Sequence, residues 1–261
     1  MSGMAHRPTT TLAILALNEI EAIQVVVPQI DRSWVDEIIV VDGGSTDGTI
    51  EWCEAYGLRV LRQRGRGYGA GMREVMEIAR GEFVIEFMAD GNSDPHAIPR
   101  IIAKIAEGYD LVVGSRYIDG AKSYDDTLIT RFGNWCFTKL VNVLFRGNFT
   151  DAMMGFRAYR IAAFQTMQVD EDGLTFPTQG SIQFTKYGYR IAEVGASEPK
   201  RIGGVRKAHN FYTGLELLRM IGREYVRPVE RRAASERGQA WAIRRSRVGS
   251  DLRTERVEIG D

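Results

Sequence analysis

The sequence predicts an α/β protein with a doubly wound, mostly parallel central sheet. Along the first 115 residues, short runs of Val, Ile and Leu alternate with stretches whose apolar residues recur at helical spacing. Several runs are apolar without interruption, which is typical of parallel strands covered by helices on both faces. The length of 261 residues fits one large α/β domain with an appendage better than two full domains.

Strand and helix follow one another in order from the N-terminus. Strands are expected at residues 11–17, 37–41, 58–61, 83–87 and 110–114, with helices between them at residues 20–30, 49–56, 68–80 and 98–107. Asn18 stands at the N-cap position of the first helix, and a turn-rich loop from Asp42 to Gly48 precedes the second. In such sheets ligands bind beyond the carboxyl ends of the strands. We therefore expect one site in the loops after Leu17, Val41, Leu61, Phe87 and Gly114.

The alternation ends after Arg116. A long helix is expected at residues 128–145, an irregular region at 151–160, short strands with turns at 174–207, and an amphipathic helix at 213–226. The tail from Arg227 has scattered charges and few apolar anchors, so we expect it to be mobile. The prediction is a domain at residues 1–210 and a C-terminal extension, helix plus charged tail, at residues 211–261.

The composition excludes disordered, collagen-like and disulfide-rich proteins, because 44% of the residues are hydrophobic and only Cys53 and Cys136 are present. No apolar run reaches the about 18 to 20 residues of a membrane span, and the first residues lack the apolar segment of a signal peptide. We expect a cytoplasmic protein with no nucleic-acid partner. The zero net charge is unevenly distributed: residues 1–199 carry 19 basic and 26 acidic side chains, and residues 200–261 carry 15 and 8. The basic end is suited to an anionic partner.

Two strand-end loops carry candidate ligands. The loop from Asp42 to Thr49 combines a carboxylate, two glycines and a hydroxyl, which suits a sugar nucleotide but equally a turn with a helix cap. Asp90 follows a buried strand, and Asn92 lies two residues further on. Oxygen ligands at this spacing suit Mg²⁺ or Mn²⁺ held together with substrate phosphates, although a turn residue is the commoner role of a lone Asp.

Six short motifs carry a resemblance to a known family. They are Ala-Leu-Asn-Glu at 16–19, Val-Val-Asp-Gly-Gly-Ser-Thr-Asp-Gly-Thr at 40–49, Gly-Tyr-Gly-Ala-Gly at 67–71, Met-Ala-Asp at 88–90, Gly-Ser-Arg-Tyr at 114–117 and Met-Gly-Phe-Arg at 154–157. Their order and spacing resemble the family 2 glycosyltransferases, above all the dolichol-phosphate mannose synthase and polyprenyl-phosphate glycosyltransferase branch. The resemblance spans residues 9–207. It implies the GT-A fold, a nucleotide-sugar donor, Mg²⁺ or Mn²⁺, and inversion at the anomeric carbon.

The resemblance also implies roles for single residues. On the donor side it implies contacts to the base and ribose from Ala16, Asn18, Glu19 and Asp42, a donor contact from Gly67, and metal and diphosphate binding by Asp90 with Asn92. Arg116 and Arg131 match basic positions that neutralise phosphate. Asp151 is the candidate base for a hydroxyl acceptor, or else the ion-pair partner of Arg157. The acceptor phosphate is assigned to a basic loop with Lys200, Arg201, Arg206 and Lys207.

The sequence departs from the family pattern at two positions. Met88 replaces the first aspartate of the Asp-x-Asp metal motif, and Gly43 replaces the second aspartate of Val-Asp-Asp-Gly-Ser. With one carboxylate fewer, we expect the cation to depend more on the donor diphosphate.

The residues leave several functions open. We favour a polyprenyl phosphate as the acceptor, with peripheral attachment to the inner face of the membrane through the helix at 213–226. A soluble small-molecule acceptor explains the lack of a span more simply. A non-catalytic sugar-nucleotide-binding protein is the alternative that Met88 and Gly43 motivate. A dinucleotide-dependent oxidoreductase is the alternative that the Gly-x-Gly-x-x-Ala pattern at 65–70 motivates, with Asp90 about 20 residues on.

Overall fold

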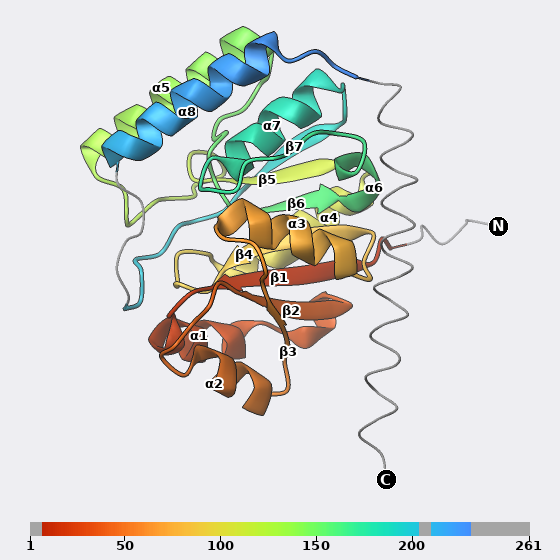
Figure 1. Ribbon diagram of the computed structural model, residues 1–261, viewed down its shortest axis with the longest axis vertical. Helices are drawn as coiled ribbons and strands as arrows, with labels where there is room; N and C mark the ends of the chain where they lie inside the picture. The colour runs from red at the N-terminus through yellow and green to blue at the C-terminus, as the bar shows by residue number, and fades with distance from the viewer. Residues whose placement is uncertain (1–6, 204–209, 231–261) are drawn as a thin grey trace, which may run out of the picture.

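The computed structural model describes residues 7–203 and 210–230. Within them, seven strands form one sheet in the order β3-β2-β1-β4-β6-β5-β7 (Figure 1). The strands are β1 (Thr10–Ala16), β2 (Glu37–Asp42), β3 (Arg59–Arg62), β4 (Phe83–Met88), β5 (Leu111–Ser115), β6 (Arg157–Arg160) and β7 (Ile191–Gly195). β6 runs antiparallel to both of its neighbours, and the other pairings are parallel. The expected α/β architecture is confirmed.

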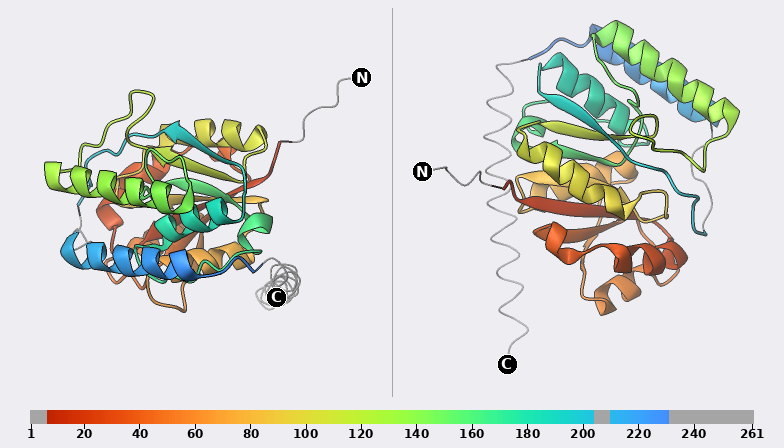
Figure 2. Two further views of the ribbon diagram at one scale, coloured as in Figure 1. Left: turned by 90° about the horizontal axis from the view of Figure 1, so that it is seen from above. Right: turned by 180° about the vertical axis from the view of Figure 1, so that it is seen from behind.

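The first half of the chain follows the predicted alternation. Its helices are α1 (Ile20–Val26), α2 (Thr49–Ala55), α3 (Tyr68–Ile78) and α4 (Ile98–Ala106), with single 3₁₀ turns at Val27–Gln29, Arg32–Trp34 and Pro95–Ala97. α1 is shorter than expected because Pro28 lies in the turn that follows it and cannot donate a helical hydrogen bond. β1 is buried along its whole length between β2 and β4. α3 and α7 cover one face of the sheet (Figure 1), and α4 covers the other (Figure 2).

The second half differs from the prediction at two elements. Residues 157–160, expected to be irregular, form β6 in the middle of the sheet, and residues 176–186, expected to be strands and turns, form α7 (Phe176–Lys186). β6 carries the fully buried Arg157, whose guanidinium donates to the carbonyl oxygen of Pro177 at 2.6 Å. α7 buries Gln179 and Gln183, which both donate to the buried carboxylate of Glu224. Long-range polar contacts therefore stabilise both elements.

The helices α5 (Leu128–Phe145) and α8 (Asn210–Val226) lie side by side at one end of the sheet, beside α7 (Figures 1 and 2). The prediction of both helices is confirmed, and a short α6 (Ile161–Phe164) follows β6. Leu217, Met220 and Ile221 of α8 are buried against the rest of the fold, whereas its Leu215, Leu218 and Tyr225 are exposed. No helix in the described part of the chain is long and apolar enough to cross a membrane. Residues 231–261 of the expected tail lie outside the described residues, and the domain boundary at residue 210 stays a prediction.

Candidate functional site

A cavity of about 810 Å³ opens at the carboxyl ends of β1 and β4. The loops after β1, β2, β3 and β4 contribute to its lining, as the parallel sheet predicts. Met153, Met154 and Phe156 line it from the segment before β6, and Thr213 from α8. The charged and amide side chains that line it are Glu19, Gln63, Arg66, Asp90, Asn92, Asp125, Glu198 and Arg201. Of the predicted site residues, Ala16, Glu19, Gly67, Asp90, Asn92 and Arg201 line this cavity.

Hydrogen bonds tie the loops after β1 and β2 together. The Asn18 side-chain oxygen accepts from the backbone of Thr46 at 2.8 Å, and the Asn18 backbone donates to the Ser45 hydroxyl at 2.9 Å. Asn18 is not the N-cap of α1, as expected from its position, because it lies in the left-handed region (φ 54°) and Glu19 is the capping residue. The backbone amide of Ile20 instead donates to Asp47 across the two loops. The edge of the cavity is thus held by reciprocal contacts.

Asp42 is 1% exposed and holds the β2–α2 loop from within. Its carboxylate accepts from the backbone amides of Gly44 at 2.8 Å and Ser45 at 3.1 Å. Gly43, its neighbour, lines the cavity in its place. Asp42 therefore shapes the backbone that faces the cavity, and its expected contact to a nucleoside stays a prediction.

Gly67 lines the cavity at the start of α3, where its φ of 100° favours glycine. A Cβ at this position would clash with the backbone oxygen of Asp172. The glycine is thus required by the path of the chain as well as by the close approach of residue 172.

Asp90 lies at the end of β4 and is 3% exposed. One carboxylate oxygen accepts from the Asn92 backbone at 2.9 Å, and the other forms an ion pair with Arg201 at 2.8 Å. A second nitrogen of Arg201 lies 3.6 Å from a carboxylate oxygen of Glu19. The Arg201 guanidinium therefore bridges the two acidic residues at the ends of β1 and β4.

The residues around Asp90 fit a divalent cation only together with other ligands. Within residues 7–203 and 210–230, no three His, Cys, Asp or Glu side chains are grouped in a way that suits a metal. The side-chain oxygen of Asn92 is buried without a hydrogen-bond partner in the described residues, which leaves it free to act as a ligand. Two or three oxygens of this kind match Mg²⁺ and Mn²⁺, which complete their shells with substrate phosphates and water.

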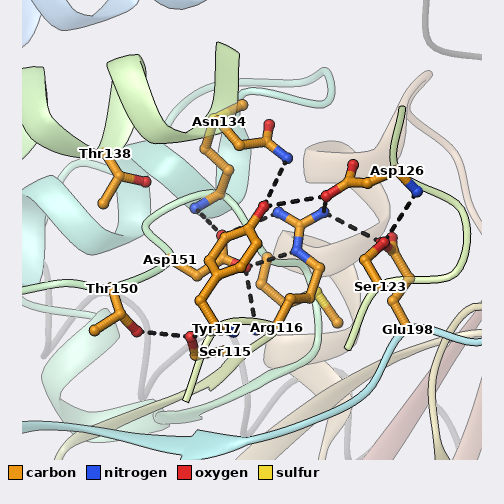
Figure 3. Close-up of polar contacts among 12 residues, drawn as sticks. Ser115, Arg116, Tyr117, Ser123, Asp126, Asn134, Thr138, Thr150, Asp151 and Glu198 are labelled. Carbon is orange, nitrogen blue, oxygen red and sulfur yellow. Dashed lines mark hydrogen bonds and ion pairs between the residues drawn. The ribbon is translucent and has the colours of Figure 1, made fainter. Parts of the chain in front are cut away.

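Arg116 is at the centre of a buried ionic cluster (Figure 3). It donates to Asp151 through two nitrogens, at 2.7 and 3.0 Å, and lies 3.3 Å from Glu198 and 3.8 Å from Asp126. Burial opposes the charge of the Arg116 guanidinium, but Asp151 and Glu198 outweigh it and raise its pKa. Asp151 is fully buried. It pairs with Arg116 and not with Arg157, and neither Arg116 nor Asp151 is part of the cavity lining.

The remaining basic candidates lie outside this cluster. Arg131 is exposed, with its guanidinium 5.8 Å from the centre of the Tyr117 ring, and Lys200 is exposed next to Arg201. Arg206 and Lys207 lie outside the described residues. The expected role of Arg131 in neutralising the diphosphate leaving group, and the assignment of the basic loop to an acceptor phosphate, stay predictions.

Two acidic residues of the cavity, Asp125 and Glu198, did not emerge from the sequence. Glu198 accepts from Ser123 and Arg116 and lines the cavity, and burial raises the pKa of its carboxyl above the ordinary value. Its place before Pro199, at the start of the basic loop, was the only signal in the sequence. Asp125 accepts from the Asn92 amide at 3.4 Å.

Comparison with known proteins decides the family. The profile of glycosyl transferase family 2 matches residues 11–167, which is more than half of the chain. The chain belongs to glycosyl transferase family 2. The family assignment makes it a glycosyltransferase, which sets aside the oxidoreductase and the non-catalytic binding protein. In the structure, the Gly-x-Gly-x-x-Ala pattern spans the end of the β3–α3 loop and the first turn of α3, at the third strand-helix junction of the sheet.

Individual relatives agree with this assignment. Glycosyltransferase AglJ of Haloferax volcanii is 30% identical over 68% of the chain, and the chain covers 58% of that relative. Undecaprenyl-phosphate mannosyltransferase of Micrococcus luteus is 28% identical over 72% of the chain, and the chain covers 85% of that relative. Glucosyl-3-phosphoglycerate synthase from Mycobacterium tuberculosis, solved with Mn²⁺, UDP and phosphoglyceric acid, superimposes with a TM-score of 0.65 at 20% identity. That match covers 85% of this chain and 80% of the synthase. At this identity the likeness shows the fold, and the expected GT-A fold is confirmed.

Proposed function

We propose that this glycosyltransferase moves a hexose, with inversion, from a UDP- or GDP-linked sugar to the phosphate of a polyprenyl phosphate. The observation that carries the proposal is the cavity of about 810 Å³, into which Glu19, Asp90 and Asn92 bring oxygen ligands at the carboxyl ends of β1 and β4. A cavity of this size falls in the range of small-molecule sites. Its position is the one at which open α/β sheets bind nucleotides.

On the donor side, Ala16 lines the cavity, and Asn18 and Asp42 hold the two loops that frame it, so we assign these residues to the part of the site that would hold the base and ribose. Asp90 and Asn92 would hold Mg²⁺ or Mn²⁺ together with the donor phosphates, and such a cation neutralises the diphosphate as it leaves. Mn²⁺ and UDP in the solved structure of the Mycobacterium tuberculosis synthase support this choice of cofactor and donor class. Arg201 adds a further positive charge beside Asp90.

On the acceptor side, a phosphate is ionised near neutral pH and needs no protein base. One of its oxygens forms the bond to the anomeric carbon while the bond from that carbon to the diphosphate breaks, and the nucleoside diphosphate leaves with the electron pair. Asp151 is then a positioning residue for Arg116 and not a base, consistent with its full burial. Arg131 and Lys200 are the exposed cations proposed to receive the acceptor phosphate. The name of the Micrococcus luteus relative supports this acceptor class.

An exposed apolar stripe on α5 supports attachment to a membrane surface. Leu128, Phe132 and Trp135 recur at helical spacing and are 86, 66 and 55% exposed. The Phe132 and Trp135 rings stack with their centres 6.0 Å apart. α8, beside α5, exposes Tyr212 in its first turn and contributes Thr213 to the cavity. A lipid-linked phosphate held at such a surface would reach the cavity without leaving the membrane.

The donor half of the proposal is tested by Asp90→Asn. The variant should lose transfer of hexose from UDP- or GDP-sugars to a short polyprenyl phosphate by about a hundredfold or more, since it removes a charge that the diphosphate site needs. Lipid-linked product is measured by mass spectrometry, and a circular dichroism melt shows that the variant is folded. Asp94→Asn in the same loop is the matched control, because Asp94 caps the 3₁₀ turn at Pro95–Ala97 and does not line the cavity. Undiminished transfer by Asp90→Asn contradicts the site.

The acceptor half is tested by flotation with liposomes that contain anionic lipid. The double variant Phe132→Ser/Trp135→Ser should partition about tenfold less than the wild type, because two large apolar side chains no longer enter the lipid. Val25→Ser, on α1 at the other end of the sheet, removes an exposed apolar side chain of 47% exposure and should float like the wild type. If the wild type neither floats nor forms lipid-linked product but still transfers hexose to a phosphorylated small molecule, the acceptor is soluble.

A further inference from the structure

The segment after β7 contributes Glu198 and Arg201 to the lining of the proposed donor cavity and is called the strap, defined here as residues 197–203. At its start, the backbone of Glu198 donates to Lys122 and accepts from Tyr124, at 2.9 and 2.8 Å. At its end, the Ile202 backbone donates to the backbone oxygen of Asp90 at 3.0 Å. The strap thus connects the buried Arg116 cluster, through Glu198, to the end of β4.

The strap sits closely on the loop that carries Asp90. Gly91 has a φ of 86°, and a Cβ there would lie 2.8 Å from the side chain of Ile202. Gly203 has a φ of 65°, and a Cβ there would clash with the Glu21 carboxylate. Glycine is therefore needed at position 91 for the contact between the strap and the Asp90 loop, and at position 203 for the contact between the strap and α1. These two contacts, which directly follow Arg201 in the chain, fix where it lies.

Arg201 forms an ion pair with Asp90, the carboxylate that a divalent cation would need as a ligand. Its guanidinium lies 2.8 Å from Asp90 and 3.6 Å from Glu19, with 19% of the arginine side chain exposed against 4 and 5% for the two acids. Met88 stands where a second carboxylate of this site would be expected. A guanidinium and a divalent cation repel each other at this range, so they compete for Asp90. The Arg201 Nε–H is buried and has no hydrogen-bond partner in the described residues, so the guanidinium keeps a donor for a phosphate.

We propose that Arg201 is an internal counter-cation that holds Asp90 in the nucleotide-free protein and is drawn to the donor diphosphate when the donor binds. Divalent-cation binding then depends on the donor. When no donor is bound, Arg201 neutralises Asp90 and Glu19, and when the donor binds, Arg201 moves to the diphosphate and Asp90 is released for the cation. The inference rests on the proposed function in one respect, since it takes the cavity as the donor site. Its effect on cation affinity, however, can be measured without any donor.

The experiment titrates nucleotide-free protein with MnCl₂ and follows free Mn²⁺ by electron paramagnetic resonance. Arg201→Gln should bind Mn²⁺ about tenfold more tightly than the wild type or better, because the competing charge is gone. Arg201→Lys should stay close to the wild type, because it keeps a positive charge on the strap. Arg66→Gln is the matched control, since it removes an identical charge from the lining of the same cavity but not from Asp90. Arg201→Gln/Asp90→Asn should lose the gain.

Repeating the titration with UDP tests the second half of the proposal. UDP should raise the Mn²⁺ affinity of the wild type by a larger factor than that of Arg201→Gln, in which Asp90 is already released. The proposal is overturned if Arg201→Gln binds Mn²⁺ no better than the wild type, or if Arg66→Gln gains as much. Thermal melts of each variant exclude loss of folding as the cause. If UDP has no effect on any variant while the nucleotide-free gain is present, the donor assignment fails and the Arg201 contact stands.

Discussion

Asp151→Asn should destabilise the fold through Arg116 before it affects any chemistry. Asp151 is fully buried, Arg116 is 7% exposed, and two hydrogen bonds of 2.7 and 3.0 Å join them. Removing one partner of such a pair leaves an uncompensated buried charge, which costs about 3 to 5 kcal/mol. Glu198 and Asp126 remain 3.3 and 3.8 Å from Arg116 and offset part of this loss. We therefore expect the lower end of that range, about 3 kcal/mol of unfolding free energy.

Urea unfolding followed by circular dichroism measures this loss of stability. Equal m-values for the wild type and Asp151→Asn would show that both expose the same surface on unfolding. Glu107→Gln is the control, because it makes the same carboxylate-to-amide change in an ion pair with Lys104 on the surface and should change the unfolding free energy little. A decrease of less than about 1 kcal/mol in the unfolding free energy of Asp151→Asn, which is the range of an exposed ion pair, would refute the conclusion that the buried Arg116–Asp151 pair stabilises the fold. If activity then fell while stability did not, Asp151 would return as the base.

Two further predictions concern a buried carboxylate, Glu86, and a glycine of the cavity lining, Gly67. Burial raises the pKa of Glu86 to about 8, against the opposing charge of Arg157. At pH values between the ordinary carboxyl pKa and about 8, Glu86 is therefore protonated in the folded state and ionised in the unfolded state. The unfolding free energy of the wild type should therefore fall as the pH rises between these two pKa values. Urea unfolding at pH 5.5 and at pH 8 should show Glu86→Gln becoming more stable relative to the wild type at the higher pH. A difference between the two proteins that does not change with pH contradicts this prediction. Gly67→Ala should lower the unfolding free energy by about 1 to 3 kcal/mol and weaken UDP binding in calorimetry, because an alanine is strained at φ 100°. Gly133→Ala, within α5 and with open space around it, should be neutral or stabilising, and equal effects of the two substitutions count against the reasoning.

The parts of the fold that the sequence predicted are those whose local pattern and tertiary environment agree. β1, β2 and β5 are uninterrupted apolar runs because helices or neighbouring strands cover them, and any window of the sequence shows this. β6 and α7 escaped prediction because polar residues are buried in them beside the apolar ones, which breaks the hydrophobic pattern. Arg157 is satisfied by the carbonyl of Pro177, and Gln179 by Glu224, 45 residues further on. Hydrophobic periodicity does not register partners at such distances.

The same distinction applies to the site. Asp90 and Glu19 were predictable because each follows the end of a buried parallel strand, and the sheet brings such ends together. The pairing of Arg116 with Asp151 spans 35 residues and two loops, and the competing prediction paired Asp151 with Arg157 instead. Glu198 directly precedes the lysines and arginines of the basic loop, and the sequence was therefore interpreted as an anion-binding loop without a role for the acid. Residue type alone does not reveal which opposite charge a side chain meets in the fold.

The charges around the cavity connect these pairings to the proposed function. Glu19, Asp90, Asp125 and Glu198 line it, against two arginines, Arg66 and Arg201. An anionic diphosphate is repelled by this lining unless positive charge arrives with it or is already in place. Arg201 is in place, but Asp90 holds it, and the strap that carries it is fixed at Glu198 by the buried Arg116. Under the proposed function, Arg116 would thus act on the diphosphate through the strap, although it does not line the cavity itself.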